Sequence, residues 1–245
     1  IKSINDIEIF ARTTPYQKLR ITKILQEKGE VVAITGDGIN DALALKSANI
    51  GIAMGQRGTD VARDVSDIVL IDDNFASIVE GIKQGRKTYD NIKKFTKFFL
   101  AVNFSEVFLV LFALIMGMLY GSDKWFLPLL PLQILWMNLV TDSLPALSLV
   151  FEEQDSVMES KPRKEKSILS GIWKFVIIAG LLAFLSGSIV YSIGIKNNIS
   201  PEQTRTIVIT TAILFELLFV YVVRSEKSLF KIGFFSNRYV NYAVL

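Results

Sequence analysis

The chain has two regimes of hydrophobic patterning. Residues 1–97 alternate apolar and charged positions as a soluble domain does, whereas residues 98–223 contain long runs almost without charge. A helix that crosses a bilayer needs about 20 mostly apolar residues. Runs of this kind occupy residues 98–120, 125–151, 175–195 and 206–223, and the start of a further span is expected near 237–245. Four such runs in succession predict a bundle of membrane helices rather than a set of buried soluble helices.

Basic residues alternate between the loops that join these runs. The group before the first run consists of Lys83, Arg86, Lys87, Lys93, Lys94 and Lys97. The group between the second and third runs consists of Lys161, Arg163, Lys164 and Lys166, and the group after the fourth run consists of Arg224, Lys227 and Lys231. The other two loops are poorer, with Lys124 in one and Lys196 and Arg205 in the other. Because loops rich in Lys and Arg stay on the cytoplasmic side, the soluble front is expected in the cytoplasm. The pattern does not indicate which membrane is used.

The front of the chain has the pattern of an α/β domain. A helix is predicted over residues 15–28, beginning at Pro15 and ending at Gly29. The alternation then continues through a strand at 31–34, a helix at 41–48, a strand at 50–54, a helix from about 59 and a strand at 67–71. Strands that alternate with helices predict a parallel sheet. We therefore expect an α/β domain over residues 1–75 and an all-α membrane domain over 76–245.

The loop T-G-D-G-I-N-D follows the first of these strands. In parallel sheets, ligands bind beyond the carboxyl ends of the strands. Carboxylates suit Mg²⁺ together with water and phosphate oxygens, hydroxyl and amide groups donate to phosphate, and glycines let the backbone approach a ligand. The loop supplies all of these in Asp37, Asp41, Thr35, Asn40, Gly36 and Gly38. The alternative is an ordinary polar turn in which the aspartates only cap a helix.

Polar side chains recur at helical spacing inside the apolar runs. Asn103 and Glu106 are three residues apart, hence on one helical face. Asn138, Thr141 and Asp142 share one face of the next run. Glu216 is a single carboxylate in the fourth run. Ionisable groups inside spans are costly and usually functional, and Pro145 weakens the helix beside Asp142. These oxygen ligands suit Ca²⁺, although Na⁺, K⁺ or protons could use them, and polar contact between helices is the alternative.

Composition narrows the chemistry. The sequence contains no cysteine and no histidine, so this chain offers no disulfide, no thiolate site and no imidazole ligand for a metal. Any metal that it holds must be bound by oxygen. The net charge of +3 is explained by solvated lysines and gives no reason to expect nucleic acid as a partner.

Three segments carry a resemblance to a known family. The run T-G-D-G-I-N-D-A-L-A-L-K-S-A-N-I-G-I-A-M-G resembles the hinge motif in the phosphorylation domain of P-type cation-transporting ATPases. The runs N-F-S-E and L-W-M-N-L-V-T-D-S-L-P-A resemble the fifth and sixth spans of calcium pumps of the sarco/endoplasmic-reticulum type. This resemblance implies a haloacid-dehalogenase-like fold for the front, with Asp37 holding the catalytic Mg²⁺ and with Asn40 and Asp41 supporting it. The segment F-A-R-T-T-P-Y-Q-K points to Lys18 as a contact of the phosphoryl group.

The same resemblance implies calcium transport driven by ATP through an aspartyl-phosphate intermediate. In that case ATP is the substrate, Mg²⁺ is the cofactor and Ca²⁺ is the transported ion. Membrane lipid surrounds the helices. The family's D-K-T-G-T motif is absent from this sequence, as are counterparts of the nucleotide-binding domain, the actuator domain and the first four spans. We therefore expect a C-terminal fragment that is inactive alone and needs the remainder of the pump. Alternatives are a sodium, potassium or proton pump of the same family, and a non-catalytic membrane subunit or channel.

The junction between the two regimes carries a further expectation. From Phe75 to Tyr120 there is no proline, so we predict one helix that continues from the soluble domain into the first span. Such a helix is a rigid lever that would transmit movement of the Asp37 domain to Asn103 and Glu106. The charged loop at residues 152–166 is expected either to lie against the soluble domain or to be a solvated linker.

Overall fold

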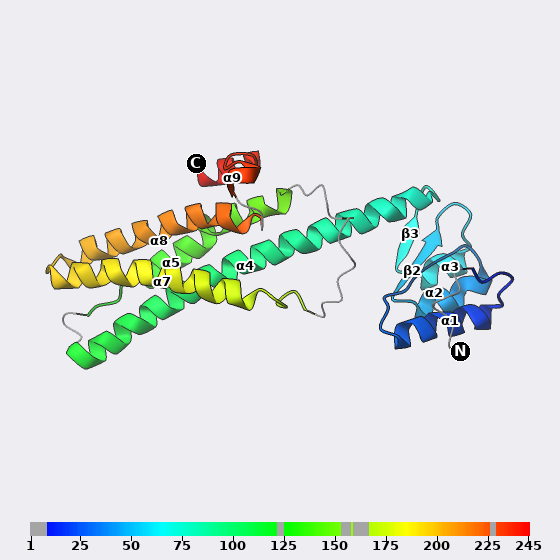
Figure 1. The fold of residues 1–245 in the computed structure, drawn as a ribbon, viewed down its shortest axis with the longest axis horizontal. Helices are drawn as coiled ribbons and strands as arrows, with labels where there is room; N and C mark the ends of the chain where they lie inside the picture. Colours follow the sequence, from blue (N-terminus) through cyan, green and yellow to red (C-terminus); the bar gives the residue numbers. More distant parts are fainter. Residues whose placement is uncertain (1–8, 122–124, 153–157, 159–166, 226–228) are drawn as a thin grey trace. The chain divides into compact units, whose positions relative to one another are not determined.

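The computed structural model describes residues 9–121, 125–152, 158, 167–225 and 229–245. The chain forms two compact units, Ile1–Ile82 and Lys83–Leu245, which are described separately below (Figure 1). The predicted position of the loop 152–166 against the soluble domain lies outside the described residues, except that Glu152 is buried within the second unit.

The first unit contains a three-stranded parallel sheet in the order β1 (Ala33–Gly36), β2 (Ile50–Met54) and β3 (Ile68–Leu70). The helical elements are α1 (Pro15–Glu27), the 3₁₀ turn η2 (Ile39–Asp41), α2 (Ala42–Ser47) and α3 (Asp60–Val65). The predicted parallel sheet is confirmed, but its first strand begins two residues later than predicted. The cause is Asn49, whose side chain accepts the Val32 N–H at 2.9 Å and replaces a regular ladder bond there.

Local sequence explains how α1 forms. Thr14 accepts the N–H of Gln17, and the Gln17 side chain accepts the N–H of Thr14, which makes a reciprocal capping box. Pro15 occupies the first helical turn, where its missing N–H costs nothing. Gly29 follows the helix with a φ of 82°, a conformation that glycine adopts without strain. The predicted helix is therefore present, with Lys18 in its second turn.

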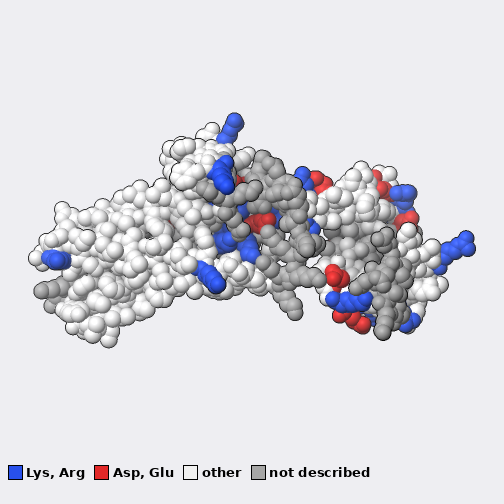
Figure 2. Space-filling model, in the orientation of Figure 1, with Lys and Arg blue, Asp and Glu red and all other residues white. Residues whose placement is uncertain are grey.

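The second unit is helical. It contains most of α4 (Phe75–Tyr120), then α5 (Pro131–Trp136), the π turn η3 (Met137–Thr141), α6 (Ser143–Ser148) and the 3₁₀ turn η4 (Leu149–Phe151), followed by α7 (Trp173–Lys196), α8 (Pro201–Val223), α9 (Leu229–Ile232) and α10 (Arg238–Val244). Among the described residues, four stretches are long and apolar enough to cross a membrane: Phe75–Tyr120, Pro131–Phe151, Trp173–Lys196 and Pro201–Val223. Figure 2 shows that the visible surface of this unit carries few charged side chains between its ends. The chain is therefore an integral, multi-pass membrane protein.

The second span differs from its prediction. Helix was expected from residue 125, but it begins at Pro131. Pro128 and Pro131 each disfavour helical backbone in the preceding residue. Side chains of α7 and α8 also bind the segment before Pro131. The Tyr191 hydroxyl donates to the Phe126 carbonyl, and Arg205 Nε donates to the Leu127 carbonyl. A further span was expected to start near residues 237–245. The structure has the seven-residue helix α10 there, and the span itself stays a prediction.

Small residues on α7 let its neighbours come close. A Cβ at Gly180 would lie 2.7 Å from Cδ1 of Phe104 on α4, and one at Gly194 would lie 2.6 Å from Cγ2 of Thr204 on α8. A Cβ at either position would force these neighbouring side chains to shift, so both positions favour glycine. The close packing of α7 brings α4 and α8 into one bundle, and these two helices carry Glu106 and Glu216.

Candidate functional site

Three helices of the second unit bring polar side chains together in its interior. Glu106 comes from α4, Asn138 and Thr141 come from the π turn, and Glu216 comes from α8. Asn138 Nδ2 donates to Glu106 Oε2 at 3.0 Å, and Thr141 Oγ1 lies 3.4 Å from Glu216 Oε2. Residues as far as 75 positions apart in sequence therefore meet.

Several of the acidic oxygens at this place lack a partner. Asp142 is completely buried, and Glu106 and Glu216 are 6% and 3% exposed. Within the described residues, neither oxygen of Asp142 nor Oε1 of Glu106 has a hydrogen-bond partner. Asp142 lies near enough to Glu216 for the two carboxyl groups to interact. Buried acidic groups without partners are unfavourable unless a cation or proton compensates them, so this arrangement favours a cation site.

A small cavity of about 20 Å³ borders the acidic cluster. Glu106, Glu216 and Ser105 supply its polar lining, and the rest comes from apolar residues of α4, α7 and α8 together with Leu129, which precedes α5. This volume holds about one water-sized species. The cavity is therefore of the right order for a single ion that has lost most of its hydration shell.

The π turn interrupts regular α-helical hydrogen bonding at the site. The N–H of Asp142 donates to the carbonyl of Met137, five residues earlier, at 2.9 Å. Pro145 has no N–H to offer the carbonyl of Thr141, so regular α-helical bonding fails here. Such wide turns are frequent at functional sites. The sequence predicted a weakened helix at Pro145, but it gave no signal for the wider turn before it.

Not every expected ligand joins the cluster. Asn103 Nδ2 donates to the Phe99 carbonyl on its own helix at 2.9 Å, and no contact with the acidic residues is observed. Across the described ranges, no three acidic side chains lie close enough to hold one metal ion between them. The arrangement consists instead of the pairs Glu106–Asn138 and Glu216–Thr141, with Asp142 near the second pair.

The first unit places the T-G-D-G-I-N-D loop directly after β1. Lys18 Nζ donates to Asp41 Oδ1 at 2.5 Å, which joins α1 to the start of α2. Gly36 must be glycine, because a Cβ there would lie 2.5 Å from the Cβ of Asp41. The side chains of Thr35, Asp37 and Asn40 are exposed. Lys18 and Asp41 are thus in contact, while the roles of these five residues stay predictions.

The exit from the first unit is held by two neighbouring aspartates. Asp73 accepts the N–H groups of Gln56 and Arg57 at 3.0 and 2.8 Å, which ties the loop after β2 to the end of β3. Asp72 accepts the Ser77 hydroxyl at 2.8 Å, and this bond together with the Asn74 N–H holds the pKa of Asp72 below its ordinary value. These contacts fix the turn from which α4 starts.

Comparisons with known proteins agree with this architecture. Residues 126–245 match the family described as "Cation transporting ATPase, C-terminus". A calcium-transporting ATPase of Bacillus subtilis is 43% identical over 249 residues, which cover 99% of this chain and 27% of that protein. Calcium-transporting ATPase 1 of Yarrowia lipolytica is 40% identical over 239 residues, 96% of this chain and 25% of that protein. A solved structure entitled "Conformational changes in the catalytic domain of the CPx-ATPase CopB-B upon nucleotide binding" is 36% identical and covers 34% of this chain and 32% of that one, with a TM-score of 0.30.

The extent of these matches defines what the chain represents. It spans about a quarter of the length of the curated relatives that it matches, and it is therefore part of a larger pump. The match over residues 126–245 covers the π turn, Asp142 and α8 with Glu216. The chain belongs to the P-type cation-transporting ATPases, with residues 126–245 forming the family's C-terminal membrane region.

Proposed function

We propose that the complete protein transports Ca²⁺ across a membrane at the expense of ATP, through an aspartyl-phosphate intermediate. In this proposal the chain contributes the magnesium-binding loop and most of the ion-binding helices. The observation that carries it is the buried acidic cluster of Glu106, Asp142 and Glu216, in which three carboxylate oxygens have no hydrogen-bond partner among the described residues. A calcium ion supplies the missing positive charge and takes oxygen ligands in flexible geometry.

The residues of the cluster have distinct tasks in binding the cation. Asp142 and Glu106 would supply the unpartnered oxygens. Glu216, on a different helix, would join them only after the three carboxyl groups move closer together, since in the described arrangement they do not surround one ion. Asn138 donates its amide N–H to Glu106, so its amide oxygen is left to face an ion. Because the ligands come from α4, the π turn and α8, movement of one helix relative to the others changes the number of oxygens around the ion. That change is a physical basis for releasing it.

The exposed loop of the first unit fits the requirements of phosphoryl transfer. Asp37 would hold Mg²⁺, which neutralises charge on the phosphoryl oxygens, and Thr35 and Asn40 would donate to these oxygens. Lys18 is held by Asp41 at 2.5 Å, which orients its ammonium group from α1. The nucleophilic aspartate would come from the part of the pump that precedes this chain in the relatives' architecture.

We infer that α4 links phosphoryl transfer at the loop to cation binding at the acidic cluster. It runs without interruption for 46 residues, from Phe75 to Tyr120, and it carries Glu106. Helix rises about 1.5 Å per residue, so a displacement at its start is passed along its length if the hydrogen-bond ladder is intact. The single continuous helix predicted from the sequence is present; its role as a lever is part of the proposal.

The proposal is tested on the complete pump reconstituted in vesicles. ATP hydrolysis and ion uptake are titrated separately with calcium, sodium, potassium and manganese. We expect activation by micromolar calcium, accompanied by calcium uptake. Activation by sodium or potassium alone would replace calcium as the transported ion, and ATP hydrolysis without any cation dependence would overturn the proposal.

A matched pair of variants on α8 ties the activation to the site. Glu216→Gln removes the buried carboxylate, whereas Glu202→Gln makes the same chemical change at an exposed position in the first turn of the helix. We expect the first variant to lose calcium activation and the second to keep it. Equal calcium activation in both would exclude Glu216 from the site.

A further inference from the structure

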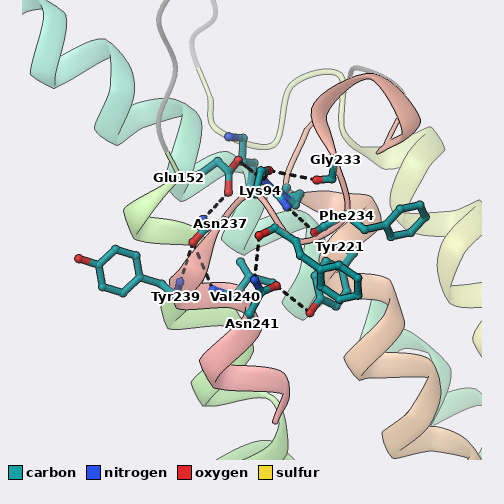
Figure 3. A network of polar contacts seen from close by, with 12 residues as sticks. Lys94, Glu152, Tyr221, Gly233, Phe234, Asn237, Tyr239, Val240 and Asn241 are labelled. Atoms are coloured by element: carbon teal, nitrogen blue, oxygen red, sulfur yellow. Dashed lines mark hydrogen bonds and ion pairs between the residues drawn. The ribbon is translucent and has the colours of Figure 1, made fainter.

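A second buried polar cluster lies where the second and fourth spans end (Figure 3). Its centre is Glu152, which directly follows η4. Arg224, the residue that caps the C-terminus of α8, donates from Nε and Nη2 to Glu152 Oε1 at 3.3 and 3.1 Å. Asn237, the residue that caps the N-terminus of α10, donates from Nδ2 to Glu152 Oε2 at 2.5 Å. All three side chains are buried, with Arg224 only 1% exposed.

The remaining polar atoms of this cluster are also engaged. Arg224 donates from Nη1 to the Phe234 carbonyl at 2.9 Å and from Nη2 to Ser236 Oγ at 2.5 Å. Asn237 Oδ1 accepts the N–H groups of Tyr239 and Val240, at 2.9 and 3.3 Å, and thereby caps α10. The orientation of the Asn237 amide is therefore fixed, because its oxygen serves the helix and its nitrogen serves Glu152.

Helix α4 joins the cluster through Asn91. The Asn91 side chain is 2% exposed and donates from Nδ2 to the carbonyls of Val150 and Glu152, at 2.8 and 3.3 Å. Lys94 Nζ in turn lies 3.4 Å from Asn91 Oδ1, and its charge is close enough to interact with that of Glu152. The backbone that ends the second span is thus bound to α4 by a side chain 59 residues away.

These connections concern the same three spans that carry the acidic cluster. Asn91 shares α4 with Glu106, Glu152 ends the span that contains Asp142, and Arg224 ends the helix that contains Glu216. The separations along the chain are 8 to 15 residues, which corresponds to roughly 12 to 22 Å of helix, so none of these residues reaches the ion. A buried ion pair adds little stability compared with apolar residues of similar volume, and specifying one arrangement is its better attested use.

We propose that Glu152 and Arg224 are positioning residues for cation binding: with Asn237 and Asn91 they fix the relative register of the three ligand-bearing spans. This inference rests on the proposed function of the acidic cluster. Loss of the network lets each helix shift along or around its axis, and oxygens that must meet at one ion no longer do so. The expected consequence is a weaker affinity for the cation in a pump that still folds and turns over.

Glu152→Gln is the decisive substitution, since it keeps the shape of the side chain. The new amide can still accept from Arg224 with its oxygen, but its nitrogen must face the Asn237 nitrogen, and two donors then oppose each other. Asn237 cannot turn over without uncapping α10. We expect the calcium concentration for half-maximal ATP hydrolysis to rise by roughly 3- to 30-fold, the range that loss of a coupling contact produces.

A compensating substitution follows from the same geometry. Asn237→Asp alone places a second carboxylate against Glu152 and should weaken calcium binding. Combined with Glu152→Gln, it offers the new amide an acceptor, keeps a negative charge near Arg224 and retains a favoured residue at the helix cap. The double variant should return to within about 3-fold of the wild-type half-activation, a recovery that independent contributions would not give.

The measurement separates positioning from a general structural role. Half-activation by calcium and the maximal phosphoenzyme level from ATP are recorded for the wild type, both single variants and the double variant of the complete pump. Lys174→Gln, which removes an exposed cation from α7, is the control. The proposal expects the calcium concentration for half-maximal ATP hydrolysis to rise in the single variants, while the phosphoenzyme level at saturating calcium stays unchanged. A lower phosphoenzyme level with unchanged half-activation, or no recovery in the double variant, overturns it.

The failure of this inference is distinguishable from failure of the proposed function. A wild-type pump that calcium activates, with variants that respond as the wild type does, overturns the positioning role alone. A wild-type pump that no cation activates overturns the proposed function and the positioning role with it. Activation by another cation changes only the ion with which the same five proteins are titrated.

Discussion

The two units of this chain use the same residue type in opposite surroundings. In the first unit, Asp37 is exposed, and Asp41 is paired with Lys18 at 2.5 Å. In the second unit, Asp142 is completely buried and neither of its oxygens has a partner among the described residues. Water and a lysine therefore balance the carboxylates of the loop, whereas the carboxyl group of Asp142 interacts with two further acidic groups, those of Glu216 and Glu106.

This difference indicates when each group needs its ligand. An exposed carboxylate is stable without a metal, so under the proposed function the loop would gain and lose Mg²⁺ and a phosphoryl group at little cost. A buried carboxylate requires a cation or a proton, because removing a charge from water is expensive. The loop suits transient chemistry in contact with water, and the acidic cluster suits an ion that must be held and then expelled. Changes at the two aspartates should therefore have separable effects.

The largest expected effect is on ATP turnover, from Asp37→Asn. Removing the proposed magnesium ligand should lower ATP hydrolysis by on the order of 1,000-fold, the loss that accompanies removal of a key electrostatic group. Because Asp37 is exposed, the free energy of unfolding should change by less than about 0.5 kcal/mol. Equilibrium calcium binding, measured with radioactive calcium in the absence of ATP, should be unchanged. Loss of calcium binding in this variant would contradict the separation of the two sites.

Asp142→Asn should produce the converse result. We expect calcium affinity to fall by roughly 100-fold, because a neutral amide replaces an anionic ligand. Loss of a residue that only supports a metal ligand already lowers affinity by up to about 100-fold. The rise in unfolding temperature that calcium causes in the wild type should disappear as well, since a ligand stabilises a protein only by binding to it. Both quantities are measured on the complete pump in detergent. Retained stabilisation by calcium would exclude Asp142 as a ligand.

The two units also differ in how far the sequence could predict them. The T-G-D-G-I-N-D loop lies within seven consecutive residues, and helical spacing placed Asn138, Thr141 and Asp142 on one side of their span. The convergence of these residues with Glu106 and Glu216 followed from the cost of burying polar groups in a membrane. Local pattern therefore assigned these residues to their elements, but it also offered Asn103, whose amide donates to the Phe99 carbonyl of its own helix.

Features that depend on distant residues could not be predicted in this way. Helix was expected at residues 125–130, but prolines and contacts from Tyr191 and Arg205 keep that segment non-helical. The partners of Glu152 lie 72 and 85 residues away and share no periodic pattern. In the sequence, Arg224 serves only as a marker of membrane orientation. Its burial and its ion pair become visible only once the helices are packed.

A smaller but still marked effect is expected when α4 is interrupted, which tests whether the two units act together. Ile92 is 41% exposed and lies within the helix. Ile92→Pro removes a helical hydrogen bond and clashes with the preceding turn, at a cost of about 3 kcal/mol. We expect ATP hydrolysis to continue at a reduced rate while calcium uptake per ATP falls. Ile92→Ala, which trims the side chain but keeps the helix, is the control, and an unchanged ratio of uptake to hydrolysis in the proline variant would exclude the lever.

The smallest effect should be confined to the first unit, at the capping box of α1. Thr14→Ala removes the acceptor of the Gln17 N–H, observed at 3.3 Å, at a cost of about 1 kcal/mol. If the unit is built from local contacts, amide hydrogen exchange should accelerate about 5-fold in the first turns of α1, where Lys18 lies, and nowhere in the helical bundle. Thr13→Ala, one residue earlier and outside the capping box, is the matched control. Faster exchange in α8 as well would show that loosening Lys18 is felt at the acidic cluster, and that the two sites are coupled even without ATP.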